Sequence, residues 1–504
     1  MPGDKSVLII GAGVAGLAAR VYARLNGYRA IILEMHDRPG GMVTAWERQG
    51  YRVDGCIEFL HGSNPDSRWN QLWRELGVAQ ELAFVDQPEL LRVRDCQGHE
   101  LIFSTDLDRL EMHLLSLATG DAPVIRETIG ATRAMASFDP PLDVPNPLAR
   151  LGELGRMRRW QNAFDLSNQV TVRSFHERFK DPFLRQAFLH LAPPDTPMGA
   201  VLARLAFHAN RNMGYPLGGS LALAQSIKRR FLALGGEILY QARVDQILTS
   251  LQPRGQGDRA AGVHLEDGRI LEADWVISAA DGRTTVTDLL NSQYSDETIL
   301  RRYNDLPLSP PIMQVALGVR FELSGEPPVQ MDLLRQPLYL AGRNQFYLRY
   351  RHYACDTSAA PPGRTVIITR LPSDYNYWQA LGYGSTRYEM AKEEVTQTLI
   401  DHFEQRFPGI TGRIEMTDVA TPLTYARYTG SHHGIGHSFA LSPQTIGFAS
   451  ASMDPTLPGL AGFFQIGQWT HPGGGVFPAA RSGREIVRRL CQEDGKRFTG
   501  GKNG

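Results

Sequence analysis

The stretch VLIIGAGVAGLAARVYARLNGYRAIILE, residues 7–34, constrains the fold more than any other part of the chain. A continuous apolar run typical of a covered parallel strand leads into Gly11, Gly13 and Gly16. Apolar residues then recur at every third or fourth position, which predicts an amphipathic helix, and AIILE indicates a second strand that ends at Glu34. These elements within one unit of about thirty residues predict a dinucleotide-binding βαβ motif.

Each glycine of this turn has its own physical role in such a motif. Gly11 allows the tight turn from strand to helix, Gly13 lets a pyrophosphate approach the backbone, and Gly16 lets the helix pack closely on the strand. The first helical N–H groups, at Val14 and Ala15, lie at the positive end of the helix dipole. Glu34 is placed to bind a ribose diol and disfavours a 2′-phosphate, so an ordinary glycine turn explains the pattern less well.

Composition describes an ordinary globular chain. A length of 504 residues fits two or three domains, and the formal net charge of zero excludes a general attraction to nucleic acid or anionic lipid. The four cysteines are far apart and no metal-ligand spacing occurs, so we expect no metal and free thiols in a reducing, cytoplasmic compartment. We also expect no signal peptide and no membrane-spanning helix, because no suitable apolar run is found.

The segment HDRPGGMVTAWERQGYRVDGC, residues 36–56, follows the acid. Here the sequence resembles the phytoene-desaturase and carotenoid-isomerase branch of the FAD-dependent amine-oxidase-like superfamily. The resemblance implies that Gly40 and Gly41 approach the FAD pyrophosphate. Met42 stands where that family often has a basic residue, and Arg38 is the candidate to replace its side-chain contact.

Two later segments extend the resemblance. In YPLGGSLALAQSIKRRFLALGGEILYQARVDQIL, residues 215–248, Val244 matches the residue whose backbone pairs with the adenine. In GLAGFFQIGQWTHPGGGVFPAARSGREIVRRL, residues 459–490, a glycine turn is expected to cross the flavin and the last helix to point at its ring. The alternative for the glycines is a flexible loop. The cofactor residues implied by this segment are Gly467, Gln468, Gly474, Gly475 and Val476.

The resemblance implies an α/β fold with a Rossmann-type FAD-binding domain that is discontinuous in sequence. We assign residues 1–105, 211–300 and 441–504 to it, residues 106–210 to a helical insert, and residues 301–440 to a mixed α+β substrate domain. The insert is a candidate for a membrane-facing surface, with an ordinary solvated helix face as the alternative. Its basic residues of interest are Arg150, Arg156, Arg158 and Arg159.

Catalytic residues are harder to assign, because no acid–base set or metal motif stands out. By analogy, the candidates near the flavin are Glu58, His61, Tyr425 and His471, with His432 and His433 as further choices. Each histidine could equally be a structural residue. Hydride transfer to flavin N5 needs no protein base when the substrate is well positioned.

The resemblance therefore implies an FAD-dependent oxidoreductase that acts on C–C bonds of a long apolar substrate, such as a polyene or isoprenoid. The sequence does not distinguish desaturation, saturation and isomerisation. It also leaves open whether NAD(P)H is an external reductant, whether the protein contacts a membrane peripherally, and what its oligomeric state is. One alternative is a flavin amine oxidase with Trp469 or Tyr425 in an aromatic cage. Another is a non-catalytic prenyl-binding chaperone that resembles the Rab GDP dissociation inhibitors.

Overall fold

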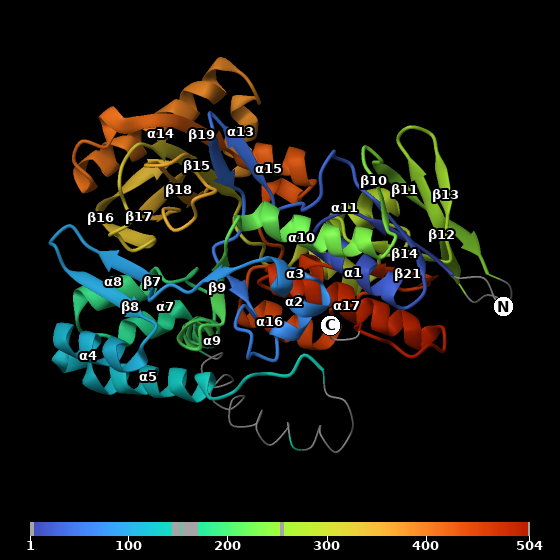
Figure 1. Ribbon diagram of the computed structural model, residues 1–504, viewed down its shortest axis with the longest axis horizontal. Helices are drawn as coiled ribbons and strands as arrows, with labels where there is room; N and C mark the ends of the chain where they lie inside the picture. Colours follow the sequence, from blue (N-terminus) through green and yellow to red (C-terminus); the bar gives the residue numbers. More distant parts are fainter. Residues whose placement is uncertain (1–4, 144–151, 153–169, 253–256, 502–504) are drawn as a thin grey trace.

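A parallel sheet of five strands lies right of centre in the view of Figure 1. The computed structural model describes residues 5–143, 152, 170–252 and 257–501. Alternate residues of the sheet's central strand face different layers. Val7 and Ile9 pack among helices, whereas Leu8 and Ile10 pack against a second sheet. This double burial explains the continuous apolar run. In sheet order the strands are β10 (Glu237–Leu239), β2 (Arg29–Leu33), β1 (Ser6–Ile10), β14 (Trp275–Ser278) and β21 (Phe463–Gln465).

Three helices cover the first face of this sheet. The first, α1 (Val14–Leu25), packs against both α10 (Gly219–Ala233) and the last helix, α17 (Val476–Glu493). A Cβ added at Gly483 of α17 would lie 2.6 Å from the carbonyl oxygen of Ala15, so the two helices touch through their backbones. This contact brings the C-terminal segment to the glycine turn of the N-terminal βαβ unit.

A second sheet covers the opposite face. Its strands are β11 (Val244–Leu251), β12 (Asp258–Leu265), β13 (Ile270–Glu272) and β20 (Leu460–Ala461). This sheet is antiparallel except for the pairing of β12 with β20. The tight turn between the antiparallel strands β12 and β13 contains Gly268 with a φ of 87°, a backbone conformation that favours glycine.

A mixed sheet of seven strands makes the upper half of the molecule. One helical layer packs on β7, β8 and β16, while α13 (Tyr375–Leu381) and α14 (Thr386–Arg406) pack on β15, β17 and β18. In sheet order the strands are β19 (Ile414–Ala420), β15 (Ile312–Val319), β18 (Thr365–Pro372), β17 (Arg343–His352), β16 (Val329–Leu340), β7 (Glu89–Arg94) and β8 (Glu100–Ser104). Only the pairing of β16 with β7 is parallel among these described strands.

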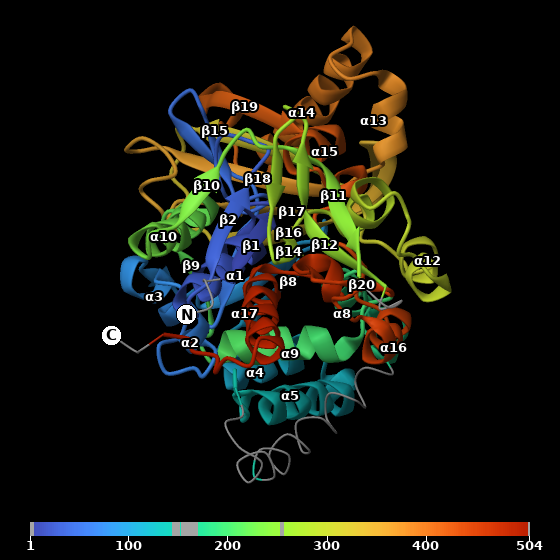
Figure 2. The ribbon, with the colours of Figure 1, turned by 90° about the vertical axis from the view of Figure 1, so that its right-hand side faces the viewer.

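The helical layer lies below the parallel sheet in Figure 2, and α13 and α14 lie above it. The layer consists of α4 (Leu107–Leu117), α5 (Ala122–Ala136), α7 (Val172–Phe175), α8 (Pro182–Leu189) and α9 (Met198–Ala209). The remaining short elements connect the layers: β3 (Ala45–Arg48), β4 (Tyr51–Asp54), β5 (Leu60–His61), β6 (Phe84–Val85), β9 (Met213–Pro216), α2 (Asn70–Glu75), α3 (Val78–Glu81), α11 (Gly282–Thr284), α12 (Glu297–Asn304), α15 (Pro422–Thr429) and α16 (Pro443–Ser452).

The predicted fold class, a Rossmann-type α/β domain with a mixed substrate domain and a helical insert, is confirmed. The boundary predicted at residue 105 does not follow the sheets, because β7 and β8 pair with β16 of the seven-stranded sheet. The four insert arginines named above lie outside the described residues. No helix in the described part of the chain combines the length and apolarity needed to cross a bilayer.

Candidate active site

A cavity of about 2160 Å³ runs from the glycine turns of the parallel sheet to the underside of the seven-stranded sheet. Its wall includes Gly13 and Glu34 from the βαβ unit and Gly475 from the start of α17. It also includes Arg349 of β17 and Arg370 of β18. The dinucleotide motif and the substrate domain therefore open into one continuous space.

Two glycine turns meet at one end of this cavity. The Gly40 N–H donates to the carbonyl oxygen of Ala12 at 2.8 Å, and Gly13 forms a parallel bridge with Gly40. A Cβ added at Gly41 would lie 3.4 Å from the Cα of Gly13, whereas one added at Gly13 would meet no atom within 4 Å. Gly13 therefore presents bare backbone to open space at the N-terminus of α1, which has no side-chain cap. Such an end suits a pyrophosphate.

Glu34, the acid of the motif, is held beside this turn by two backbone hydrogen bonds. Its carboxylate accepts from the Ala12 N–H at 2.7 Å and from the His36 N–H at 3.0 Å. The side chain is buried and still lines the cavity. An ionised carboxylate keeps lone pairs free beyond these two bonds, so it can also accept from a ribose diol.

The C-terminal turn closes the same end from the other side. The Gly467 N–H donates to the Ser482 hydroxyl of α17 at 2.9 Å, which ties the turn to the last helix. Gly475, at the N-cap of α17, has a φ of 113° and no side-chain cap. Both α1 and α17 thus begin uncapped at the cavity, and their positive dipole ends suit a ligand that carries negative charge at two places.

These residues fit a flavin dinucleotide. Apart from Gly16, every predicted cofactor residue lines the cavity, including Met42, Val244, Gln468, Gly474 and Val476. A Cβ at Gly16 would lie 2.0 Å from the Gly11 carbonyl oxygen, so this glycine serves close packing, as its place in the motif indicates. The guanidinium of Arg38 is exposed and bonds to Asp37 at 2.9 Å.

The opposite end of the cavity contains a half-buried ion cluster around Glu58, which follows β4. Arg349 binds its carboxylate with both terminal nitrogens, at 2.9 and 2.5 Å, and Arg370 binds it at 3.1 Å. Burial alone would raise the pKa of Glu58, but the two guanidinium groups hold this pKa well below its usual range. A carboxylate held in this way does not accept a proton at neutral pH.

Arg204 of α9 completes this end of the cavity. Its guanidinium lies 5.1 Å from the ring centroid of Phe59, and its buried Nε has no hydrogen-bond partner among the described residues. Burial lowers the pKa of Arg204 to about 10, and the neighbouring charge of Arg349 adds to this effect. The nearby carboxylate of Glu58 opposes this lowering, so the side chain stays charged at neutral pH although it makes no hydrogen bond or ion pair with a described residue.

His61 lies in an aromatic wall next to this arginine. Its ring centroid lies 5.1 Å from that of Phe207 and 6.1 Å from that of Trp69, and Trp69 stacks on Phe477 at 4.2 Å. Burial, and then the charge of Arg204, lower the pKa of His61 to about 4. The neutral ring lines the cavity and its Nδ1 has no hydrogen-bond partner in the described residues.

The other catalytic candidates are placed differently. The Tyr425 hydroxyl lines the cavity and donates to Gln314 Oε1 at 3.3 Å, and burial raises the pKa of Tyr425, which keeps the phenol protonated. His432 and His433 line the cavity as a stacked pair. His471 does not line it, and its Nδ1 lies 3.0 Å from the Thr470 hydroxyl. The catalytic roles stay predictions.

Sequence reasoning missed the arginines of the cavity. Arg370 interrupts the apolar run TVIITRL, and Arg204 is the only arginine, lysine or acid in the apolar helix MGAVLARLAFHA. A lone charge in a buried element is unusual unless it is paired or has a function, so both positions carried a usable signal.

The fold and the cavity together define a dinucleotide-dependent oxidoreductase. Residues 14–491 match the family of flavin containing amine oxidoreductases, and the chain belongs to this family. The protein is therefore an FAD-dependent oxidoreductase.

Known proteins similar to this chain include two carotenoid enzymes. A phytoene desaturase (lycopene-forming) from Paracoccus is 25% identical over 94% of this chain and 95% of its own length. A chloroplastic prolycopene isomerase from Daucus carota is 23% identical over 98% of this chain and 81% of its own. Among solved structures, an oxidoreductase from Methanosarcina mazei has a TM-score of 0.60 at 17% identity and covers 96% of this chain and 100% of its own.

Proposed function

We propose that this protein moves a hydride between FAD and a C–C bond of a long apolar molecule of the polyene or isoprenoid type. The volume of the cavity, about 2160 Å³, carries the proposal. Pockets for drug-sized ligands measure roughly 300–1,000 Å³, so this space accommodates a dinucleotide and a second large molecule. The relatives named phytoene desaturase and prolycopene isomerase support the same substrate class.

The walls beyond the glycine turns suit an apolar chain. Phe59, Trp69, Phe207 and Phe477 line one side, and their ring contacts fix them in place. Buried aromatic faces exclude water and provide a large contact area for a conjugated or branched hydrocarbon. Binding along such a wall would position the reacting carbons, which is where most of the barrier reduction for hydride transfer originates.

The charge of the cavity counts against an amine oxidase. Arg204, Arg349 and Arg370 surround the single carboxylate of Glu58, so this end of the cavity is positive and repels an ammonium group. The uncapped glycine turns, in turn, support an enzyme with a bound dinucleotide rather than a prenyl-binding chaperone.

The roles of the chain's own residues follow from these contacts. FAD, once bound, supplies the centre that accepts or donates the hydride. The N-terminus of α17 would stabilise negative charge on the ring. His61, with its unpartnered nitrogen, is the best placed of the four predicted candidates to exchange a proton with the carbon next to the reacting one.

Anaerobic spectroscopy of the purified yellow protein tests the proposal. We expect phytoene to bleach the oxidised flavin, lycopene to reoxidise the dithionite-reduced flavin, or prolycopene to isomerise in the presence of reduced flavin. Putrescine should not reduce the flavin, because the end of the cavity lined by Arg204, Arg349 and Arg370, here called the arginine end, repels its ammonium groups. Reduction by putrescine without any reaction of the three polyenes would overturn the proposal, and free FAD with each compound is the control.

We also propose that the substrate enters from a lipid surface. Tyr383 and Tyr428 are 53% exposed at the rim of the cavity, and the guanidinium of Arg427 lies 5.0 and 4.7 Å from their ring centroids. Exposed aromatic rings beside a cation suit the headgroup region of a bilayer. We expect the protein to float with anionic liposomes, and the double variant Tyr383→Ser/Tyr428→Ser to float less. Equal recovery of both proteins in the unbound fraction would contradict this.

A further inference from the structure

The arginine end of the cavity is built for an anion that the chain itself does not supply. Arg349 and Arg370 share the carboxylate of Glu58, whereas Arg204 has neither a hydrogen bond nor an ion pair with any described residue. Arg204 is half-buried, and its Nε is buried without a hydrogen-bond partner, which is unfavourable for a cation that has no ion pair. A resting structure that keeps one beside its substrate cavity implies that the partner arrives with a ligand.

The position of Arg204 is fixed by its helix. Val201, Leu202 and Leu205 of α9 are buried in the core of the helical layer, while Arg204 and Phe207 line the cavity. Residues three apart lie on the same face of a helix, so the guanidinium and the Phe207 ring form one continuous piece of wall. A ligand that lies along the aromatic rings ends at this cation.

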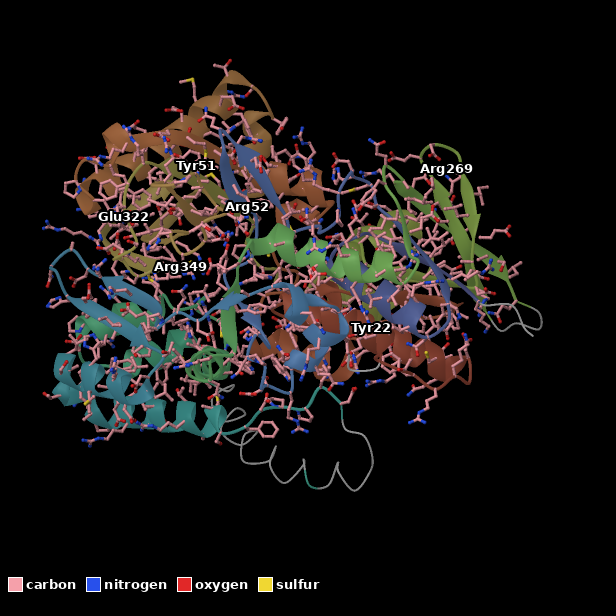
Figure 3. The ribbon with its side chains drawn as sticks, in the orientation of Figure 1. Tyr22, Tyr51, Arg52, Arg269, Glu322 and Arg349 are labelled. Carbon is pink, nitrogen blue, oxygen red and sulfur yellow. The ribbon has the colours of Figure 1, made fainter. Side chains whose placement is uncertain are left out.

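Arg349 and Arg370, the strand arginines, lie on neighbouring strands and hold the Glu58 carboxylate, and so prevent it from forming an ion pair with Arg204. Tyr350 of β17 lies opposite Thr369 of β18, and the same register places Arg349 opposite Arg370 one residue further along. Like charges facing each other across a sheet repel, and Glu58 between them offsets that repulsion. Moving this carboxylate to Arg204 would leave Arg349 and Arg370 unscreened. Figure 3 shows Arg349 of β17 at the left of the molecule, among the strands of the seven-stranded sheet and away from Tyr22 of α1.

The FAD phosphates are not the missing anion. The backbone that suits a pyrophosphate lies at Gly13 and Gly40, at the start of α1. Arg204 belongs to the helical layer, and the strand arginines belong to the seven-stranded sheet. The free cation therefore lies on the substrate side of the cavity.

We propose that the substrate is a long apolar molecule that ends in a carboxylate, which pairs with Arg204 while the chain lies along Phe59, Phe207 and Trp69. Arg204 is a cavity-lining guanidinium without a hydrogen-bonded anion among the described residues, and its planar fork fits the two oxygens of a carboxylate. The inference rests on the proposed function and narrows its substrate class.

Binding of three matched C20 isoprenoids to the flavin-loaded protein tests the inference. The probes are geranylgeranoate, geranylgeraniol and geranylgeranyl diphosphate, and tryptophan quenching reports their affinities. We expect the acid to bind about tenfold or more tightly than the alcohol, the value of one charge-assisted hydrogen bond. Arg204→Leu should abolish this preference and keep the affinity for the alcohol, and Arg204→Lys should retain part of it.

The matched control is Arg126→Leu, which removes an exposed arginine of α5 and should leave the preference unchanged. Equal affinities for acid and alcohol in the unaltered protein, or a preference for the diphosphate, would overturn the inference. A shifted flavin midpoint potential in Arg204→Leu with an intact acid preference would also overturn it, because Arg204 would then serve the reduced flavin. A colourless protein would instead contradict the proposed function itself.

Discussion

Replacing Gly13 with valine is expected to give a folded protein that no longer binds flavin. The backbone at Gly13 is extended, with a φ of −66°, and an added Cβ meets no atom within 4 Å. The free energy of unfolding of the apoprotein should therefore stay within about 1 kcal/mol of the unaltered value. The valine side chain instead enters the space above the N-terminus of α1, where the pyrophosphate would lie.

The expected loss of flavin affinity is more than about 100-fold, because a displaced phosphate forfeits charge-assisted hydrogen bonds of about 1.5–3 kcal/mol each. Flavin absorbance after reconstitution and dialysis measures the loss, and urea unfolding of the apoprotein measures stability. Gly16→Ala is the comparison variant. Its Cβ would lie 2.0 Å from the Gly11 carbonyl oxygen, so this substitution should reduce both flavin affinity and the free energy of unfolding. A yellow Gly13→Val protein would contradict the assigned cradle.

The βαβ unit could be predicted because its determinants are local. The apolar run of β1, the glycines of the turn and the spacing along α1 all lie within one short segment. Its second strand ends beside Glu34, whose carboxylate bonds back to the turn at Ala12. The C-terminal turn was predictable from its glycines, although only packing through Gly483 brings it to the same site.

The substrate side could not be predicted in the same way, because it depends on contacts between distant segments. The pattern of residues 89–104 indicates nothing about β16, with which β7 pairs, so residues 1–105 were assigned as one stretch to the FAD-binding domain. Similarly, the apolar context of Arg370 marks it as unusual, but only the strand register reveals that it faces Arg349 across Glu58. Glu58 was selected as a catalytic candidate by resemblance, and its contacts favour a positioning role.

Replacing Glu58 with leucine is expected to destabilise the protein by about 3 kcal/mol, the lower end of the cost of breaking a buried ion pair, since it leaves the half-buried Arg349 and Arg370 close together without an anion. Urea unfolding of the apoprotein measures the effect. Glu322→Leu is the matched control, because Glu322 is an exposed glutamate on the far side of the seven-stranded sheet (Figure 3) and its loss should change stability by no more than about 0.5 kcal/mol.

A double variant separates loss of the ion cluster from simple loss of packing. Glu58→Leu combined with Arg349→Met removes one of the two facing charges, so it should be more stable than Glu58→Leu alone even though it alters one more buried side chain. Additive losses in the double variant would mean that Glu58 contributes by shape and not by charge. The recovery would instead establish that this carboxylate is committed to the strand arginines, which is the reason that Arg204 needs its anion from a ligand.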